Sequence, residues 1–86
     1  MPETMTYSDM ERFLTQELHF QAKNIPGSHT IFKLPNTELI IVLNPWYKVL
    51  PKRQLVYVRQ MLAANGIMSK TQFNQMAARQ LATRQP

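Results

Sequence analysis

The chain has no cysteine, only two glycines, and no apolar run long enough to cross a bilayer. Without cysteine it can form no disulfide, thiol nucleophile or thiolate metal site, which fits a reducing compartment. Its first residues lack the basic segment and apolar run of a signal peptide. We therefore expect a cytoplasmic protein that has no membrane partner.

Acidic residues are missing from the second half of the chain, although the net charge is only +5. The five acidic residues are Glu3, Asp9, Glu11, Glu17 and Glu38. The cations that follow them are Lys48, Lys52, Arg53, Arg59, Lys70, Arg79 and Arg84. This uncompensated positive field favours a polyanionic partner such as a nucleic acid, while solubility alone is the simpler explanation.

The length of 86 residues suits one domain that spans 1–86. We expect an ordered core over about 7–81 and frayed ends at 1–6 and 82–86. With 44% hydrophobic residues, the composition is that of a globular domain rather than a disordered tail.

Three segments have the features of helices. A capping box, Ser8-Asp9-Met10-Glu11, predicts the start of an amphipathic helix over 9–18. Pro51 and Gly66 are suited to open and end a helix over 51–64, whose buried stripe comprises Leu55, Val58 and Leu62. A second capping box, Ser69-Lys70-Thr71-Gln72, precedes a helix whose inward face comprises Phe73, Met76 and Ala77.

Three strands are predicted between the first two helices. A short strand starts at Phe20, a turn covers 24–28, and a second strand runs over 29–34. The run 39–43 is so rich in branched residues that we expect burial on much of both its faces. The predicted order α-β-β-β-α-α gives an α+β fold, in which helices cover one face of an antiparallel three-stranded sheet and the other face stays open.

The open face of this sheet would present a histidine. Strand alternation places His29, Ile31 and Lys33 there, while Phe32 and Leu34 face the helices. A hairpin folded symmetrically about Pro26 would set Lys23 opposite His29, and the ammonium would favour the neutral imidazole that a general base needs. Such a base can take the 2′-hydroxyl proton of RNA so that the oxygen attacks the adjacent phosphorus. An ordinary surface histidine near a turn is the alternative.

An ordered set of features extends from about Asp9 to Met76. It comprises Gly27-Ser28-His29-Thr30-Ile31-Phe32, Pro35 in a turn, a third strand, Leu50-Pro51 before a helix that ends Ala63-Ala64-Asn65-Gly66-Ile67, and then Ser69 and Phe73. In this order and spacing the chain resembles the HicA toxins of type II toxin-antitoxin systems. Ile25-Pro26 and Asn44-Pro45-Trp46-Tyr47 depart from the family's usual residues.

The resemblance implies a double-stranded-RNA-binding-like fold and an endoribonuclease that cleaves messenger RNA in a stress response. It implies no metal and no other cofactor. A HicB-type antitoxin would neutralise the protein by covering its active site. The catalytic residue of the family corresponds to His29, which we therefore expect to perform acid-base catalysis.

Further residues are candidates for RNA contacts: Lys23, Ser28, Lys33, Lys52, Arg53 and Arg59. Lys52 and Arg59 share a face of the second predicted helix, with Arg53 beside them, where they would hold phosphates or simply be solvated. Trp46 and Tyr47 suit either the stacking of unpaired bases or a plug at the sheet edge, and for Trp46 we expect the packing role.

The second histidine, His19, is expected between the first helix and the first strand, without an acid-base role. Together with His29, and with no acidic cluster nearby, it does not form a convincing metal site.

Two other functions fit the sequence. Residues 54–76 also suit a helix-turn-helix that binds DNA, with Lys70, Gln72 and Asn74 facing the major groove. Alternatively, the same fold binds RNA by its shape without cleaving it.

Overall fold

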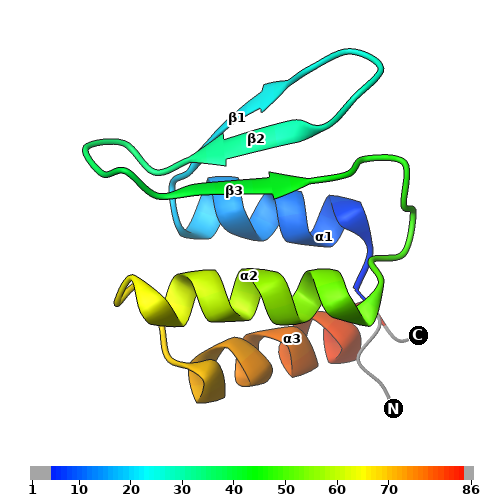
Figure 1. Ribbon diagram of the computed structural model, residues 1–86. Coiled ribbons are helices and arrows are strands. Elements are labelled where there is room, and N and C mark those ends of the chain that lie inside the picture. The colour runs from blue at the N-terminus through cyan, green and yellow to red at the C-terminus, as the bar shows by residue number, and fades with distance from the viewer. Residues whose placement is uncertain (1–4, 85–86) are drawn as a thin grey trace. The chain divides into compact units, whose positions relative to one another are not determined.

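A computed structural model describes residues 5–84, which fall into two compact units. The first unit is Thr6–Lys48, and the second holds Met5 and the chain from Val49 onward. The first contains a helix and three strands, and the second contains a helical pair (Figure 1). The predicted α+β class, with three helices and an open antiparallel sheet of three strands, is confirmed.

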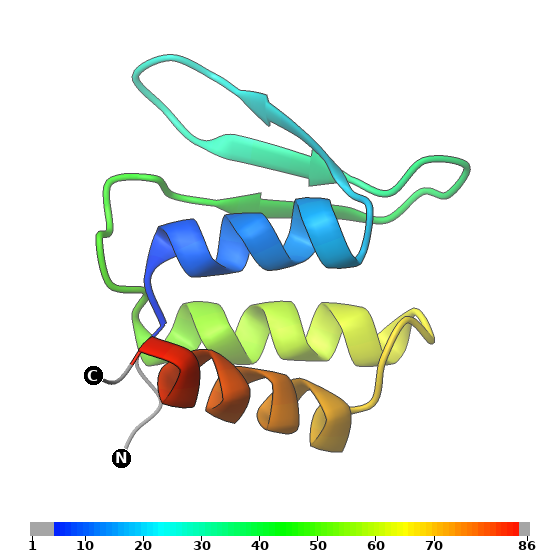
Figure 2. The same cartoon turned by 180° about the vertical axis from the view of Figure 1, so that it is seen from behind.

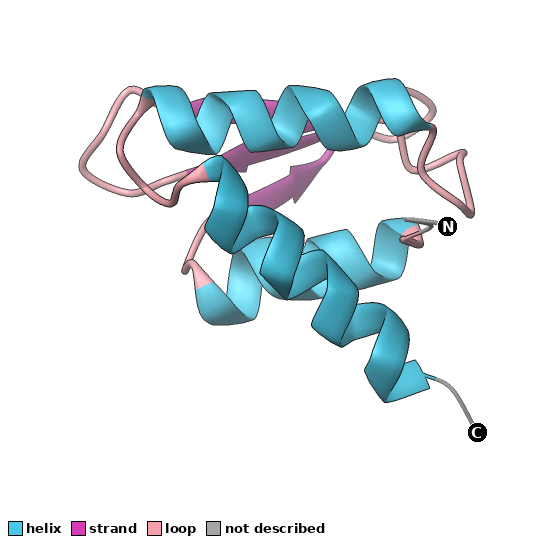
Figure 3. Cartoon of the chain, turned by 90° about the horizontal axis from the view of Figure 1, so that it is seen from below, coloured by secondary structure: helices cyan, strands magenta, loops and turns pink. Residues whose placement is uncertain are grey.

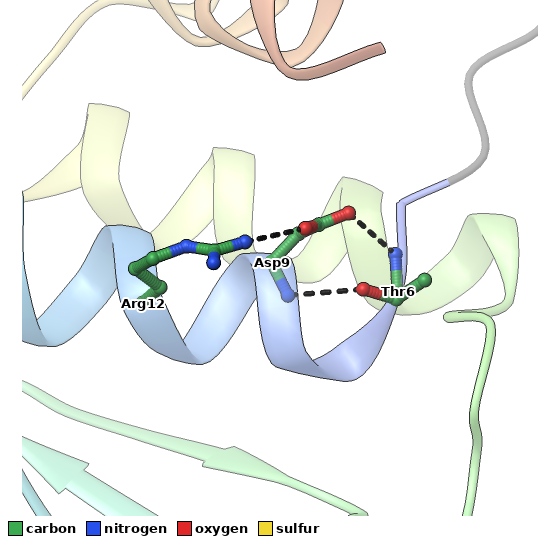
Figure 4. A network of polar contacts seen from close by, with 3 residues as sticks. All are labelled: Thr6, Asp9 and Arg12. Atoms are coloured by element: carbon green, nitrogen blue, oxygen red, sulfur yellow. Dashed lines mark hydrogen bonds and ion pairs between the residues drawn. The ribbon is translucent and has the colours of Figure 1, made fainter. Parts of the chain in front are cut away.

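Helix α1, Tyr7–Arg12, begins at a capping box formed by Thr6 and Asp9. The Thr6 hydroxyl accepts a hydrogen bond from the Asp9 backbone N–H at 3.0 Å, and the Asp9 carboxylate accepts one from the Thr6 N–H at 3.3 Å (Figure 4). Arg12 donates to the same carboxylate at 2.8 Å. These bonds satisfy orphan donors of the first turn and the negative charge of Asp9, which is only 3% exposed.

The capping box predicted at Ser8 and Glu11 is therefore wrong by two residues. The Tyr7 backbone N–H donates to the Lys48 carbonyl at 3.0 Å, so the chain is still held in an extended conformation at Thr6. This contact joins residues far apart in sequence, and local pattern alone does not reveal it.

The helical run does not stay α-helical to its end. It continues as a π-helical turn, η1, Phe13–Glu17, in which the Leu18 N–H bonds to the Phe13 carbonyl at 3.1 Å. Phe13 and Leu14 are buried, as the apolar stripe predicts. His19 then adopts a φ of 66° and lies between this turn and the first strand, as expected.

The sheet contains β1, Gln21–Asn24, β2, Thr30–Lys33, and β3, Ile40–Leu43. The strands are antiparallel and lie in sequence order. Helix α1 lies along one side of this sheet, as Figures 1 and 2 show. The Tyr7 hydroxyl reaches the sheet and donates to the Thr30 hydroxyl at 2.7 Å.

Side chains alternate between a buried and an open face along β2 and β3. Thr30, Phe32, Ile41 and Leu43 are buried, whereas Ile40 and Val42 are 43% and 39% exposed. The expectation that 39–43 is buried on both faces is therefore wrong. A strand that is apolar on both faces gives no period-two signal, so the sequence did not reveal that one face is uncovered.

The second unit is built from α2, Lys52–Ala64, and α3, Lys70–Arg84. Figures 1 and 2 show α3 running back in the opposite general direction from α2, and Figure 3 shows it diverging from α2 toward its C-terminal end. All six predicted inward residues are buried: Leu55, Val58, Leu62, Phe73, Met76 and Ala77.

The ends of both helices match the sequence signals. Pro51 is the N-cap of α2, and Gly66 follows its C-terminal end with a φ of 71°. The Ser69 hydroxyl and the Gln72 side chain form the second capping box, with bonds of 3.1 and 2.9 Å. The packing of these helices against the sheet stays a prediction.

The described residues extend beyond both limits of the expected core. Met5 is completely buried, and α3 continues to Arg84. The rest of the expected frayed ends, 1–4 and 85–86, lies outside the described residues, and the single domain stays a prediction. Within residues 5–84, no helix is both long and apolar enough to cross a membrane.

Candidate active site

His29 lies at the end of the β1–β2 hairpin, where backbone bonds fix its position. Its carbonyl accepts a hydrogen bond from the Ile25 N–H at 2.8 Å, and the Ile25 carbonyl accepts one from the Ser28 N–H at 3.0 Å. Gly27 closes the turn with a φ of 73°, a conformation that costs glycine little. The His29 side chain is half-buried, so a ligand can reach it.

The His29 ring is held by its neighbour in sequence. Ser28 Oγ lies 2.5 Å from His29 Nδ1, within hydrogen-bonding distance. When Nδ1 carries the proton and donates it to the hydroxyl, Nε2 keeps the lone pair that a general base uses. Ser28 therefore holds the imidazole in place, a role beyond the RNA contact expected for it.

The strand register contradicts the predicted neighbour of His29. Lys23 pairs with Ile31, because the hairpin is centred on Gly27 rather than on Pro26. Lys23 is therefore a diagonal neighbour of His29, at a backbone separation of roughly 7–8 Å that a lysine side chain can span.

Lys33 is on the same face as Lys23 but farther from His29. It pairs with Gln21, and its Nζ donates to the Thr37 carbonyl at 2.9 Å across the β2–β3 turn. Four residues of strand span roughly 13–14 Å, so Lys33 is too distant to share one phosphate with His29. The two lysines thus differ in their distance from His29.

Trp46 approaches the hairpin from the loop that follows β3. Its indole N–H donates to the Ser28 carbonyl at 3.1 Å, and its backbone N–H donates to Asn44 Oδ1 at 2.9 Å. The side chain is nevertheless 70% exposed, so the expected packing role is wrong. Buried aromatic side chains remove roughly 150–250 Å² from water, and leaving most of that area exposed forgoes roughly 3 kcal/mol of stability.

Tyr7 supports β2 from the helical side. Burial raises the pKa of its hydroxyl above the ordinary 10.0; the hydrogen bond with Thr30 opposes this shift and the charge of Glu11 adds to it. Tyr7 is therefore a neutral donor that holds the strand at Thr30, the residue next to His29.

The remaining predicted cations lie on α2 in the second unit. Lys52 and Arg59 line the same pocket of about 90 Å³, so their shared face is confirmed, and Lys52 and Arg53 are exposed. Arg59 is half-buried, and its Nη1 donates to Asn74 Oδ1 at 3.0 Å. A guanidinium bonded to α3 is less accessible to phosphates than the exposed Lys52.

The helical pair gives the DNA-binding alternative less support than its sequence does. Two of the three side chains expected in the major groove, Gln72 and Asn74, already accept hydrogen bonds within the unit.

Sequence reasoning named His29, Lys23 and Ser28. The structure joins Ser28 to His29 and places Lys23 as a diagonal neighbour across the hairpin. Sequence reasoning missed Asn24, which lines a pocket with Ser28 and Trp46. No pattern in the sequence marked Asn24. The placement of Trp46 did have a signal, because Asn44 precedes it by two residues and asparagine often bonds to a backbone N–H two positions later. Among residues 5–84, no group of three histidine or carboxylate side chains is placed to hold a metal ion.

Comparison with known proteins adds no relative to this description. No protein-family model matches the chain. No curated protein and no solved structure matches it either. The resemblance to the HicA toxins is therefore an expectation that rests on the sequence features alone.

Proposed function

We propose that the protein is a toxin-type endoribonuclease that cleaves messenger RNA with His29 as its acid-base residue. The observation that supports this most is the contact of Ser28 with Nδ1 of a half-exposed histidine at the edge of an open sheet face. When Nδ1 carries the proton and donates it to this serine, Nε2 is the ring nitrogen that acts as the base. The finer fold that goes with this proposal is the double-stranded-RNA-binding-like fold.

The proposed reaction needs only groups near the hairpin. His29 Nε2 takes the 2′-hydroxyl proton, the 2′-oxygen bonds to the adjacent phosphorus, and the bond from phosphorus to the 5′-oxygen breaks. The leaving 5′-oxygen takes up a proton, from the imidazolium or from water. The products carry a 2′,3′-cyclic phosphate and a 5′-hydroxyl.

Cations on the sheet complement this chemistry. Lys23 is close enough to stabilise the charge that develops on the phosphorane. Lys33, farther along β2, would hold a phosphate elsewhere on the same strand of RNA. Lys52, Arg53 and Arg59 add positive charge to the second unit, where Lys52 and Arg53 are the exposed members.

An antitoxin of the HicB type would neutralise this activity by covering the open face. The exposed apolar residues Ile40 and Val42 support such a partner, because a protein interface buries apolar side chains at its centre. Lys33 pairs with Ile40, and Lys23 lies one strand farther away, opposite Ile31. Both lysines suit acidic residues of the partner.

The test compares the wild-type protein with His29→Ala and with His19→Asn as a matched control. Asparagine tolerates the positive φ of position 19, so the control changes the other histidine without straining the backbone. We expect single-stranded RNA to be cut by the wild type and the control, with and without a chelator, and to survive His29→Ala. Expression of the wild type or of His19→Asn should arrest growth, and expression of His29→Ala should not.

Retention of cleavage by His29→Ala would refute the proposed catalytic residue. If the wild type binds RNA but leaves it intact, the non-catalytic RNA-binding module is the better description. Preference for one duplex DNA sequence would favour the helix-turn-helix.

A further inference from the structure

Trp46 is the most exposed large hydrophobic side chain in the described part of the chain. Both its backbone and its ring are nevertheless fixed, by Asn44 and by the Ser28 carbonyl. A side chain held in this way has little freedom left to lose when a ligand binds. The exposed indole is therefore preorganised for contact with another molecule.

Two pockets share Pro45 and Trp46 in their walls. The first has a volume of about 230 Å³ and is completed by Asn24, Ile25, Gly27 and Ser28. Pockets for drug-sized ligands measure roughly 300–1,000 Å³, so this one suits a single ring system. The Asn24 carboxamide offers the paired donor and acceptor that the edge of a nucleobase presents.

The second pocket, of about 350 Å³, lies on the side of the loop that holds Lys48 and Tyr47. An exposed lysine there suits a phosphate of the same strand as the base in the first pocket. Ser28 belongs to the first pocket and contacts the His29 ring, so a nucleotide seated on Trp46 would lie next to the proposed catalytic residue.

We propose that Trp46 is a stacking platform for one unpaired base next to the scissile phosphate. The substrate is then single-stranded where it is cut, because stacked neighbours cover both faces of a base inside a duplex. This inference rests on the proposed function and adds the class of substrate to it. The net charge of +5 and the nearby lysines favour RNA over an apolar peptide as the occupant.

The chain contains one tryptophan, so its fluorescence reports on this site alone. The probe is a single-stranded RNA oligonucleotide mixed with the full-length His29→Ala protein, which keeps the RNA intact. We expect stacking to quench the fluorescence with the single strand. The same sequence annealed to its complement should quench it much less.

Variants on the His29→Ala background measure the contribution of the ring. Trp46→Ala should raise the Kd for a labelled single strand by roughly 5- to 150-fold, the range found for one stacked base. Trp46→Phe should recover most of the affinity, and circular dichroism checks that both variants fold. Val49→Ala, which shortens another exposed apolar side chain, should leave the Kd unchanged.

The inference is overturned if the single strand binds without quenching, if the duplex quenches equally, or if Trp46→Ala binds as tightly as its parent. If RNA does not contact the indole, a protein partner is the better candidate for its ligand. If the single strand quenches and depends on Trp46, but the wild type cleaves no RNA, the platform stands and the ribonuclease proposal fails. If the wild type cleaves RNA but RNA does not change the Trp46 fluorescence, the ribonuclease proposal stands and the stacking platform fails.

Discussion

Replacing Lys23 with alanine should slow RNA cleavage, whereas replacing Lys33 should not. Both lysines are exposed on the same face of the sheet, but only Lys23 pairs with Ile31, two residues from His29. Lys33 is roughly 13–14 Å from His29 along the strand, and it already donates to the Thr37 carbonyl. The pair therefore separates the effect of position from the effect of charge.

The expected loss follows from the distance of each cation from the reacting phosphate. A unit charge at about 4 Å contributes about 1 kcal/mol in water and about 4 kcal/mol at an effective dielectric constant of 20. Because Lys23 is exposed, the lower value applies, which corresponds to roughly a fivefold loss of kcat. Lys33 lies beyond the Debye length of about 8 Å at physiological ionic strength, so its loss should stay below about twofold.

The assay measures initial cleavage rates of a labelled single-stranded RNA at saturating concentration. Lys23→Arg serves as the charge-preserving control and should retain most of the rate. Equal losses in Lys23→Ala and Lys33→Ala, or a larger loss in Lys33→Ala, would refute the argument that the hairpin register selects the cation near His29.

Three further predictions concern stability. Thr6→Ala removes the cap of α1 and should lower the free energy of unfolding by about 1 kcal/mol in urea titrations, with Thr6→Ser nearly neutral; identical midpoints would contradict the cap. Because burial raises the pKa of Tyr7, the folded state retains the phenol proton longer than the unfolded chain. The resulting stability is fully present below about pH 10 and is lost as the pH rises through the raised pKa. In Tyr7→Phe, the urea midpoint should therefore fall less over this pH range than in the wild type. An equal fall in both proteins would contradict the raised pKa of Tyr7. Gly66 has a φ of 71°, and a Cβ added there would meet open space. Gly66→Ala should therefore lower the free energy of unfolding by about 1–2 kcal/mol through backbone strain alone. An unchanged Tm would exclude this strain.

Much of the fold could be predicted because its signals are local. Pro51 and Gly66 mark the two ends of α2, and the Ser69 box marks the start of α3. Alternation placed Ile31 and Phe32 on opposite faces of β2, which the burial pattern confirms.

The errors arise where distant or competing contacts decide the structure. The first helix begins after Thr6 rather than at Ser8, where the bond from Tyr7 to Lys48 joins parts of the chain that are distant in sequence. The first hairpin offered Pro26 and Gly27 as its centre. The positive φ at the glycine fixed the register and moved Lys23 by two positions.

The candidate site was only partly visible in the sequence for the same reason. The sequence motif singled out His29 and Ser28, although the bond between their side chains was not predicted. Trp46 is 18 positions from Ser28, and its bond to the Ser28 carbonyl depends on how the loop after β3 turns. An aromatic residue in a loop has no local signal that separates a plug from a platform.

The chemical ends of the cleaved RNA test the central claim most directly. Mass spectrometry of products from a single-stranded substrate should find 2′,3′-cyclic phosphate and 5′-hydroxyl ends with the wild type, and intact RNA with His29→Ala. A 2′-deoxy nucleotide at the cut position should also block the wild type. Products with 5′-phosphate ends, cleavage of the 2′-deoxy substrate, or equal cleavage by His29→Ala would contradict catalysis by His29 through the 2′-hydroxyl.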